Sequence, residues 1–160
     1  MEEWSDFFVA IVGAAAALTG LIFVGVSISL SKILSVPRLT GRASESLILL
    51  LVVLTVSALC LVPNHAARLL GAEVLVIAIV VWVVSVRLDV EMLRKSEVQF
   101  KKYAWQNMLF TQLSIIPYLI AGSIILCQGY EGIYWLIPGI IFSFIKAVLD
   151  AWVLLVEIHR

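Results

Sequence analysis

An apolar stretch at 133–157 contains two charged residues, Lys146 and Asp150, four positions apart. Residues at this spacing lie on the same face of a helix, so a helix here has both charges on one side. Ser143 lies on that same side, one turn before Lys146. Because an ionised side chain in lipid is costly unless it is paired or faces a wet cavity, we expect this side to point into a helix bundle.

The composition indicates a single membrane domain. Of the 160 residues, 62% are hydrophobic and 14% are charged, which is far more apolar than a soluble domain. Eleven basic and eleven acidic residues cancel, and a protein that binds nucleic acid normally has an excess of basic residues. The acidic N-terminus does not match the basic start of a secretory signal, so the first apolar segment is interpreted as a permanent span. We therefore expect a transmembrane protein whose environment is the lipid bilayer and which binds no nucleic acid.

Apolar segments long enough to cross a membrane predict an all-α polytopic helix bundle. A hydrocarbon core of about 30 Å takes roughly 20 helical residues. Ser44 is expected to cap the second helix, with Glu45 favourable at its positive end. The short turn at 128–132 predicts that the last two spans form an antiparallel hairpin. The five expected spans are 7–30, 46–62, 69–86, 104–127 and 133–157.

The distribution of Lys and Arg predicts the orientation in the membrane. Most basic residues lie in the loop at 31–43 and in the polar connector at 87–103. Since cytoplasmic loops are enriched in Lys and Arg, we expect the N-terminus outside and the C-terminus inside. The connector at 87–103 is interpreted as a solvated segment, and a docking surface for a cytoplasmic partner is the alternative.

The fourth span has its polar residues on one face, because they follow the helical spacing i, i+4, i+7 and i+11. In an antiparallel hairpin this face matches the Ser143, Lys146 and Asp150 face in depth. We expect the two faces to meet, with Lys146 and Asp150 paired and with hydroxyls of the fourth span hydrogen-bonded around them. The polar residues of this face are Asn107, Thr111, Ser114 and Tyr118. The site either passes an ion or proton, or is an ion pair that only fixes the register of the hairpin.

The first span has a stripe of small residues on one side. Small residues spaced by three or four positions let another helix backbone approach closely. This pattern predicts helix packing on that side, either within the chain or against a second copy in a homo-oligomer. The stripe comprises Ala10, Gly13, Ala17, Gly20 and Ser27.

Other candidate sites are weaker. Cys60 and Cys127 fall near the outer ends of their spans, where a disulfide is allowed, although two free apolar thiols are favoured. His65 has no second His or Cys nearby to complete a metal site, so no metal or other cofactor is expected. An aspartyl intramembrane protease needs two membrane carboxylates, and only Asp150 is expected to be deep. We therefore expect no enzyme, but an ion or proton channel or transporter, with a membrane-embedded scaffold or regulatory subunit as the alternative.

The beginning of the chain resembles that of small uncharacterised bacterial multi-pass membrane proteins. The resemblance covers Trp4 to Ala10, Gly13 to Val24 and the basic loop Arg38 to Arg42. It implies a bacterial inner-membrane location, and it implies no activity and no site residues.

Overall fold

The computed structural model describes residues 2–95 and 101–158, and the regular secondary structure of these residues is helical throughout, with no strand. The prediction of an all-α fold is confirmed. The elements are α1 (Glu2–Ile28), α2 (Leu30–Ser35), α3 (Pro37–Cys60), α4 (Ala67–Lys95), α5 (Lys101–Gln128), the 3-10 helix η2 (Tyr130–Trp135) and α6 (Leu136–Ile158).

Within residues 2–95 and 101–158, five helical segments are long and apolar enough to cross a membrane, as predicted, and the chain is a multi-pass membrane protein. The first and fourth spans agree with the predicted ranges within a few residues, whereas the second begins earlier and the third ends later than predicted. The orientation of the termini in the membrane stays a prediction. The spans are Trp4–Ile28, Leu39–Cys60, Ala67–Arg94, Ala104–Gln128 and Tyr130–Val156.

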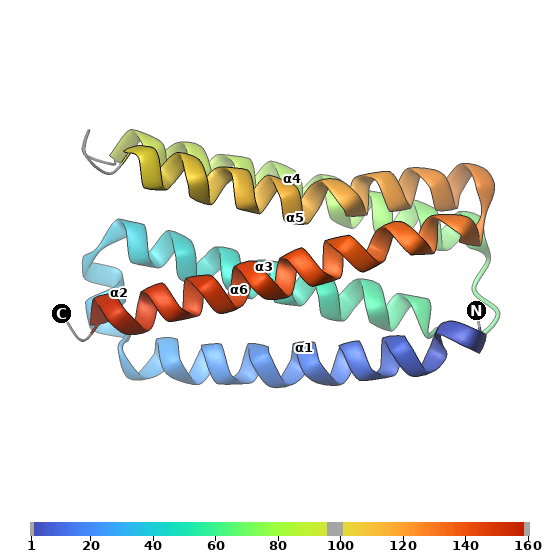
Figure 1. The fold of residues 1–160 in the computed structure, drawn as a ribbon, viewed down its shortest axis with the longest axis horizontal. Coiled ribbons are helices and arrows are strands. Elements are labelled where there is room, and N and C mark those ends of the chain that lie inside the picture. Colours follow the sequence, from blue (N-terminus) through green and yellow to red (C-terminus); the bar gives the residue numbers. More distant parts are fainter. Residues whose placement is uncertain (1, 96–100, 159–160) are drawn as a thin grey trace.

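The long helices run roughly along one axis (Figure 1). α4 and α5 form one closely packed pair, α6 packs against both α5 and α3, and α1 packs along the outer side of α3. The two ends of the chain lie at opposite ends of the bundle, as an odd number of spans requires. α3 is therefore the central helix, since it borders α1, α4 and α6, and α6 connects it to α5.

Two glycines allow the close contact between α4 and α5. A Cβ atom on Gly71 would lie 2.4 Å from the backbone nitrogen of Leu126, and one on Gly122 would lie 2.8 Å from that of Leu75. Distances this short would force the backbones apart. Gly129, with φ 85°, then begins the turn that leads through η2 into α6.

Two predicted helix boundaries are wrong, and both errors concern charged residues. α3 begins at Pro37, a residue suited to the first position of a helix, so Ser44 does not cap it and Glu45 lies inside it. α4 continues to Lys95, so the first part of the predicted solvated connector is helical and its Asp89 is buried. Residues 96–100 of that connector lie outside the described residues.

The stripe of small residues on α1 is exposed. Ala10, Gly13, Ala17, Gly20 and Ser27 are all solvent- or lipid-accessible, and a Cβ atom on Gly13 or Gly20 would have no neighbour within 4 Å. No described helix of this chain packs on that side. The close packing predicted there is therefore not made within the described chain, and packing against a second copy stays a prediction.

Candidate functional site

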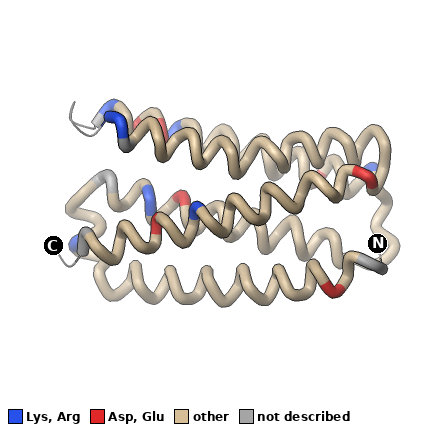
Figure 2. The backbone as a smooth tube through the Cα atoms, viewed as in Figure 1, with Lys and Arg blue, Asp and Glu red and all other residues tan. Residues whose placement is uncertain are grey.

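Five ionisable side chains meet inside the bundle, and we call them the charged cluster. Arg42 and Glu45 come from α3, Asp89 from α4, and Lys146 and Asp150 from α6. Four of them are at most 2% exposed, and the Arg42 side chain is 16% exposed. Figure 2 shows basic and acidic residues gathered on neighbouring helices in the half of the bundle that carries the C-terminus. These charges are shielded from lipid by the helices around them.

Lys146 lies at the centre of the cluster. Its ammonium group donates to the carboxylate of Asp150 one turn later on α6, and its Nζ also lies 3.2 Å from Oε2 of Glu45. On its other oxygen, Asp150 lies 3.5 Å from Nη1 of Arg42. The predicted pair of Lys146 and Asp150 is therefore present, but as part of a larger network that joins α6 to α3.

Helix α5 adds neutral hydrogen-bond donors to the network. Nδ2 of Asn107 donates to Oε2 of Glu45 at 2.8 Å and to Oδ1 of Asp89 at 3.4 Å. The hydroxyl of Thr111 donates to the carbonyl of Asn107 at 3.0 Å and lies 3.5 Å from Oε2 of Glu45. The amide of Asn107 thus lies between two carboxyl groups that come from different helices.

Helical spacing explains how each helix supplies its part of the site. Arg42 and Glu45 are three residues apart, and Lys146 and Asp150 are four apart, so each pair projects from one face. Lys146 is ten residues into α6, which places it about 15 Å from the start of that helix. Lys146 is therefore well inside the membrane-spanning part of α6.

The cluster has an excess of acidic groups. Two cations, Arg42 and Lys146, face three carboxyl groups, Glu45, Asp89 and Asp150. Among the residues that the structure describes, Asp89 has no cation within ion-pair distance, and its Oδ1 accepts a hydrogen bond from the Asn107 amide at 3.4 Å. If all three carboxyl groups were ionised, a buried negative charge would remain uncompensated, which is costly in a medium of low dielectric constant.

The predicted ring of hydroxyls around Lys146 and Asp150 is not formed. Ser114 donates to the Phe110 carbonyl of its own helix. Tyr118 and Ser143 hydrogen-bond to each other at 3.3 Å, which joins α5 to α6 at the expected depth. Of the fourth-span hydroxyls, only that of Thr111 reaches the network, through Glu45. Instead, the carboxyl groups of Glu45 on α3 and Asp89 on α4 complete the network. The sequence patterns predict both residues to lie outside the site.

Arg42, Glu45 and Asp89 are the site residues that the sequence analysis missed. From the sequence, all three residues are expected in a loop or at a helix end, because a charge beside an apolar segment usually marks the membrane interface. Pro37 was a signal that the second helix begins earlier. Ser85 and Asp89, four residues apart and both buried, continue one face of α4. The expectation that Asp150 is the only deep carboxylate is wrong, and so is the argument against a two-carboxylate protease that rested on it.

The remaining candidate residues lie outside the cluster. Cys60 is buried, Cys127 is exposed and both are free, so the allowed disulfide is not formed. His65 lies at the opposite end of the bundle, where its Nε2 is 3.2 Å from Oε2 of Glu73.

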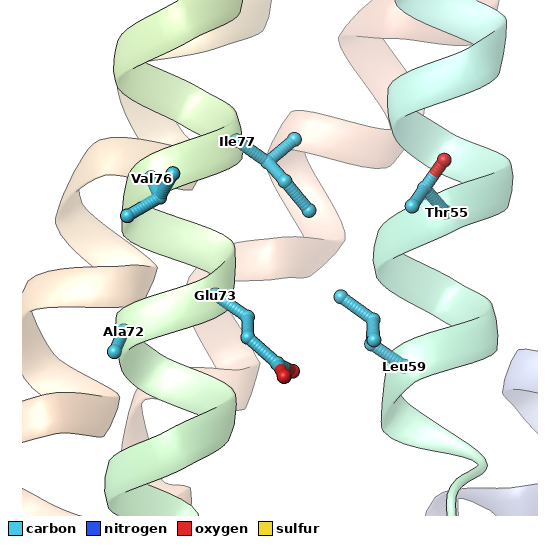
Figure 3. A pocket seen from close by; sticks show the side chains of 6 residues that line it. All are labelled: Thr55, Leu59, Ala72, Glu73, Val76 and Ile77. Atoms are coloured by element: carbon cyan, nitrogen blue, oxygen red, sulfur yellow. The ribbon is translucent and has the colours of Figure 1, made fainter.

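A shallow groove of about 450 Å³ lies between α3 and α4 (Figure 3). Its wall is almost entirely apolar, and the carboxylate of Glu73 points into it opposite Leu59. Thr55 on this wall is ten residues from Glu45, or about 15 Å along α3, so the groove is separate from the charged cluster. The lining residues are Thr55, Leu59, Ala72, Glu73, Val76 and Ile77.

The fold and the cluster together define a multi-pass helical membrane protein with a buried network of ionisable side chains. The chain matches no protein-family model, and no curated protein or solved structure is significantly similar to it.

Proposed function

We propose that the protein moves protons across its membrane through the charged cluster, as a homo-oligomer. The observation that carries this proposal is the burial of five ionisable groups from three helices within the membrane-spanning part of the bundle. Ionisable residues at such depth are rare and typically mark ion or proton pathways. Carboxyl groups and a lysine also exchange protons by their chemistry, so no further group is needed to carry the proton.

Buried polar groups extend from the cluster towards the opposite end of the bundle. Thr111, Ser114 and Tyr118 continue the face of Asn107 along α5, and all are at most 1% exposed. Asn107 and Tyr118 are eleven residues apart, which corresponds to about 16 Å along the helix. On the other side of the cluster, the Arg42 side chain is partly exposed, so the network reaches the surface near that end of the bundle. These groups support a route over part of the membrane thickness.

The homo-oligomer is proposed from the first helix. In the most apolar 18-residue stretch of α1, only 17% of the residues are buried inside the described chain, the lowest share of the five spans, and the stripe of small residues faces outward. In lipid, such small-residue faces are where helices associate most closely.

One observation favours a second function. The network joins α3, α4, α5 and α6, and polar contacts of this kind fix the register of helices without moving any ion. In this alternative the protein is a membrane-embedded scaffold or regulatory subunit that binds a cytoplasmic partner near the 87–103 connector. The exposed basic residues Arg87, Arg94, Lys101 and Lys102 would attract an acidic partner surface.

Proton flux into liposomes that contain the purified full-length chain tests the proposal. With a potassium diffusion potential applied, a pH-sensitive dye inside wild-type vesicles should report acidification faster than in protein-free vesicles. The variant with both Lys146→Met and Asp150→Leu should lose this flux while its circular dichroism stays helical. Glu73→Gln, which changes a carboxyl group outside the cluster, is the matched control and should keep the flux.

Wild-type vesicles that acidify no faster than protein-free ones would contradict proton movement. Loss of the cellular role on neutralising Lys95, Lys101 and Lys102, together with absence of flux, would instead favour the scaffold or regulatory function.

A further inference from the structure

Glu45 and Asp89 are two buried carboxyl groups that meet at one hydrogen-bond donor. They come from α3 and α4, and both accept from the same amide nitrogen of Asn107, at 2.8 Å and 3.4 Å. Their exposed fractions are 0% and 1%. Two acceptor oxygens cannot hydrogen-bond to each other unless a proton lies between them.

The remaining oxygen of each group has the same environment. Oε1 of Glu45 and Oδ2 of Asp89 are both inaccessible, and neither has a hydrogen-bond donor among the described residues. By contrast, Oε2 of Glu45 receives Lys146 and Asn107, and Oδ1 of Asp89 receives Asn107. Each carboxyl group therefore has one oxygen that accepts a hydrogen bond and one oxygen that has no donor.

The charges that face this pair come from every helix around it. α3 contributes Arg42 and α6 contributes Lys146 and Asp150. α5 contributes the neutral side chains of Asn107 and Thr111. α1 reaches the neighbouring core only with apolar side chains such as Ile22. One added proton would make the two cations and the two remaining carboxylates balance.

We infer that the protein binds a single proton between Glu45 and Asp89, shared by the two oxygens that have no other donor. Two carboxyl groups that share a buried site retain one proton between them because like charges at this distance cannot both ionise. The shared proton satisfies both leftover oxygens and makes the cluster electrically neutral. This inference rests on the proposed function for its role in transport, and it assigns the group that loads the transported proton.

The assignment also gives Lys146 a distinct part. Its ammonium contacts Oε2 of Glu45, which is not the oxygen assigned to the shared proton, and it also contacts Asp150. When the proton leaves the pair, the new negative charge lies next to this ammonium. Lys146 is therefore a positioning residue, because it stabilises the unloaded state without itself holding the shared proton.

Infrared spectroscopy of the purified full-length protein in an ester-free detergent tests the inference without any transport assay. A protonated carboxyl group has a C=O stretch that ionised carboxylates lack, and that band shifts in D2O. We expect the wild-type protein to show this band at neutral pH, and Asp89→Asn to lose it. Asp6→Asn, which changes an exposed aspartate on α1, should retain it. Incorporating aspartate and then glutamate labelled with 13C at the side-chain carboxyl should shift the wild-type band in at least one of the two cases.

The wild-type spectra decide the inference even if Asp89→Asn does not fold. Absence of the carboxyl band at neutral pH overturns it, as does a band that neither labelled amino acid shifts. A band that survives unchanged in folded Asp89→Asn and in folded Glu45→Gln also overturns it. The failure of the two proposals is distinguishable: a protein with the band but without proton flux binds the proton and does not transport it. A protein with flux but without the band transports protons by other groups.

Discussion

Nζ of Lys146 lies 3.2 Å from Oε2 of Glu45, and this contact joins two helices whose residues are 101 positions apart in the sequence. The same ammonium donates to Asp150 on its own helix. One buried cation thus serves two carboxylates. Removing one partner of a buried ion pair leaves the other charge uncompensated, and Lys146 is the partner of two carboxylates. We therefore expect the stability of the cluster to depend on Lys146 more than on any other side chain.

Replacing Lys146 by methionine should lower the free energy of unfolding by about 3–5 kcal/mol, because the change leaves two buried carboxylates without their main cation. Equilibrium unfolding in detergent micelles measures this effect. Lys101→Met, at an exposed position near the start of α5, is the control and should change the free energy by less than about 0.5 kcal/mol. Equal stability of the two variants would show that the ion pairs of Lys146 do not hold the bundle together.

The variant with both Lys146→Met and Asp150→Leu should be less destabilised than the two single variants added together. The double change takes Lys146 from Glu45 and Asp150 from Arg42, whereas the two single changes together also take Lys146 from Asp150 and Asp150 from Lys146. Residues in direct ionic contact show coupling energies of about 0.5–3 kcal/mol. A double-mutant cycle, measured by the same unfolding assay, gives this term directly. Additive effects would mean that Lys146 and Asp150 act independently in the folded protein.

Gly71→Ala should destabilise the α4–α5 pair, whereas Gly20→Ala should not destabilise the chain. A Cβ atom on Gly71 meets the backbone of Leu126 at 2.4 Å, and one on Gly20 meets nothing within 4 Å. Overpacking of this kind costs about 1–3 kcal/mol, because a backbone cannot move aside as a side chain does. The unfolding midpoints of the two variants, compared with wild type, provide the measurement. Helix propensity alone would raise the midpoint of both variants, since alanine favours a helix more than glycine does. A fall of equal size in both would therefore contradict the assignment of the effect to close packing at Gly71.

Gly13→Leu together with Gly20→Leu should reduce association between copies of the chain without unfolding one copy. Both glycines lie on the exposed stripe of α1, where leucine side chains would hold a second helix backbone away. Single-molecule subunit counting in native lipid nanodiscs should give a smaller oligomer for the variant than for wild type. Leu109→Ala, at an exposed position on α5, is the control and should keep the wild-type number. A monomeric wild-type protein would contradict the prediction that the stripe on α1 mediates association between copies of the chain.

Local sequence patterns predict most of the fold and two of the five residues of the charged cluster. Hydropathy and length are properties of single segments, so the spans could be found without knowing how they pack. The spacing of Lys146 and Asp150 likewise determines their pairing within one helix. Glu45 and Asp89 were missed because their burial depends on contacts between helices far apart in the chain. A charged residue at the edge of an apolar segment has the same local pattern whether it faces water or a buried partner, and only the packing of α3 and α4 around α5 distinguishes the two.

Tyr118→Phe should lower proton flux with only a small loss of stability. The change removes the hydroxyl that meets Ser143 at 3.3 Å, the contact at which polar side chains of α5 and α6 hydrogen-bond to each other outside the cluster. A neutral hydrogen bond contributes about 0.5–1.5 kcal/mol, so the variant should remain folded in the unfolding assay. If the buried hydroxyls relay protons to the cluster, flux into vesicles should fall several-fold. Tyr134→Phe removes an exposed hydroxyl at the other end of the bundle and should leave both measurements unchanged. Full flux in Tyr118→Phe would mean that protons reach the cluster by a route that avoids the interface of α5 and α6.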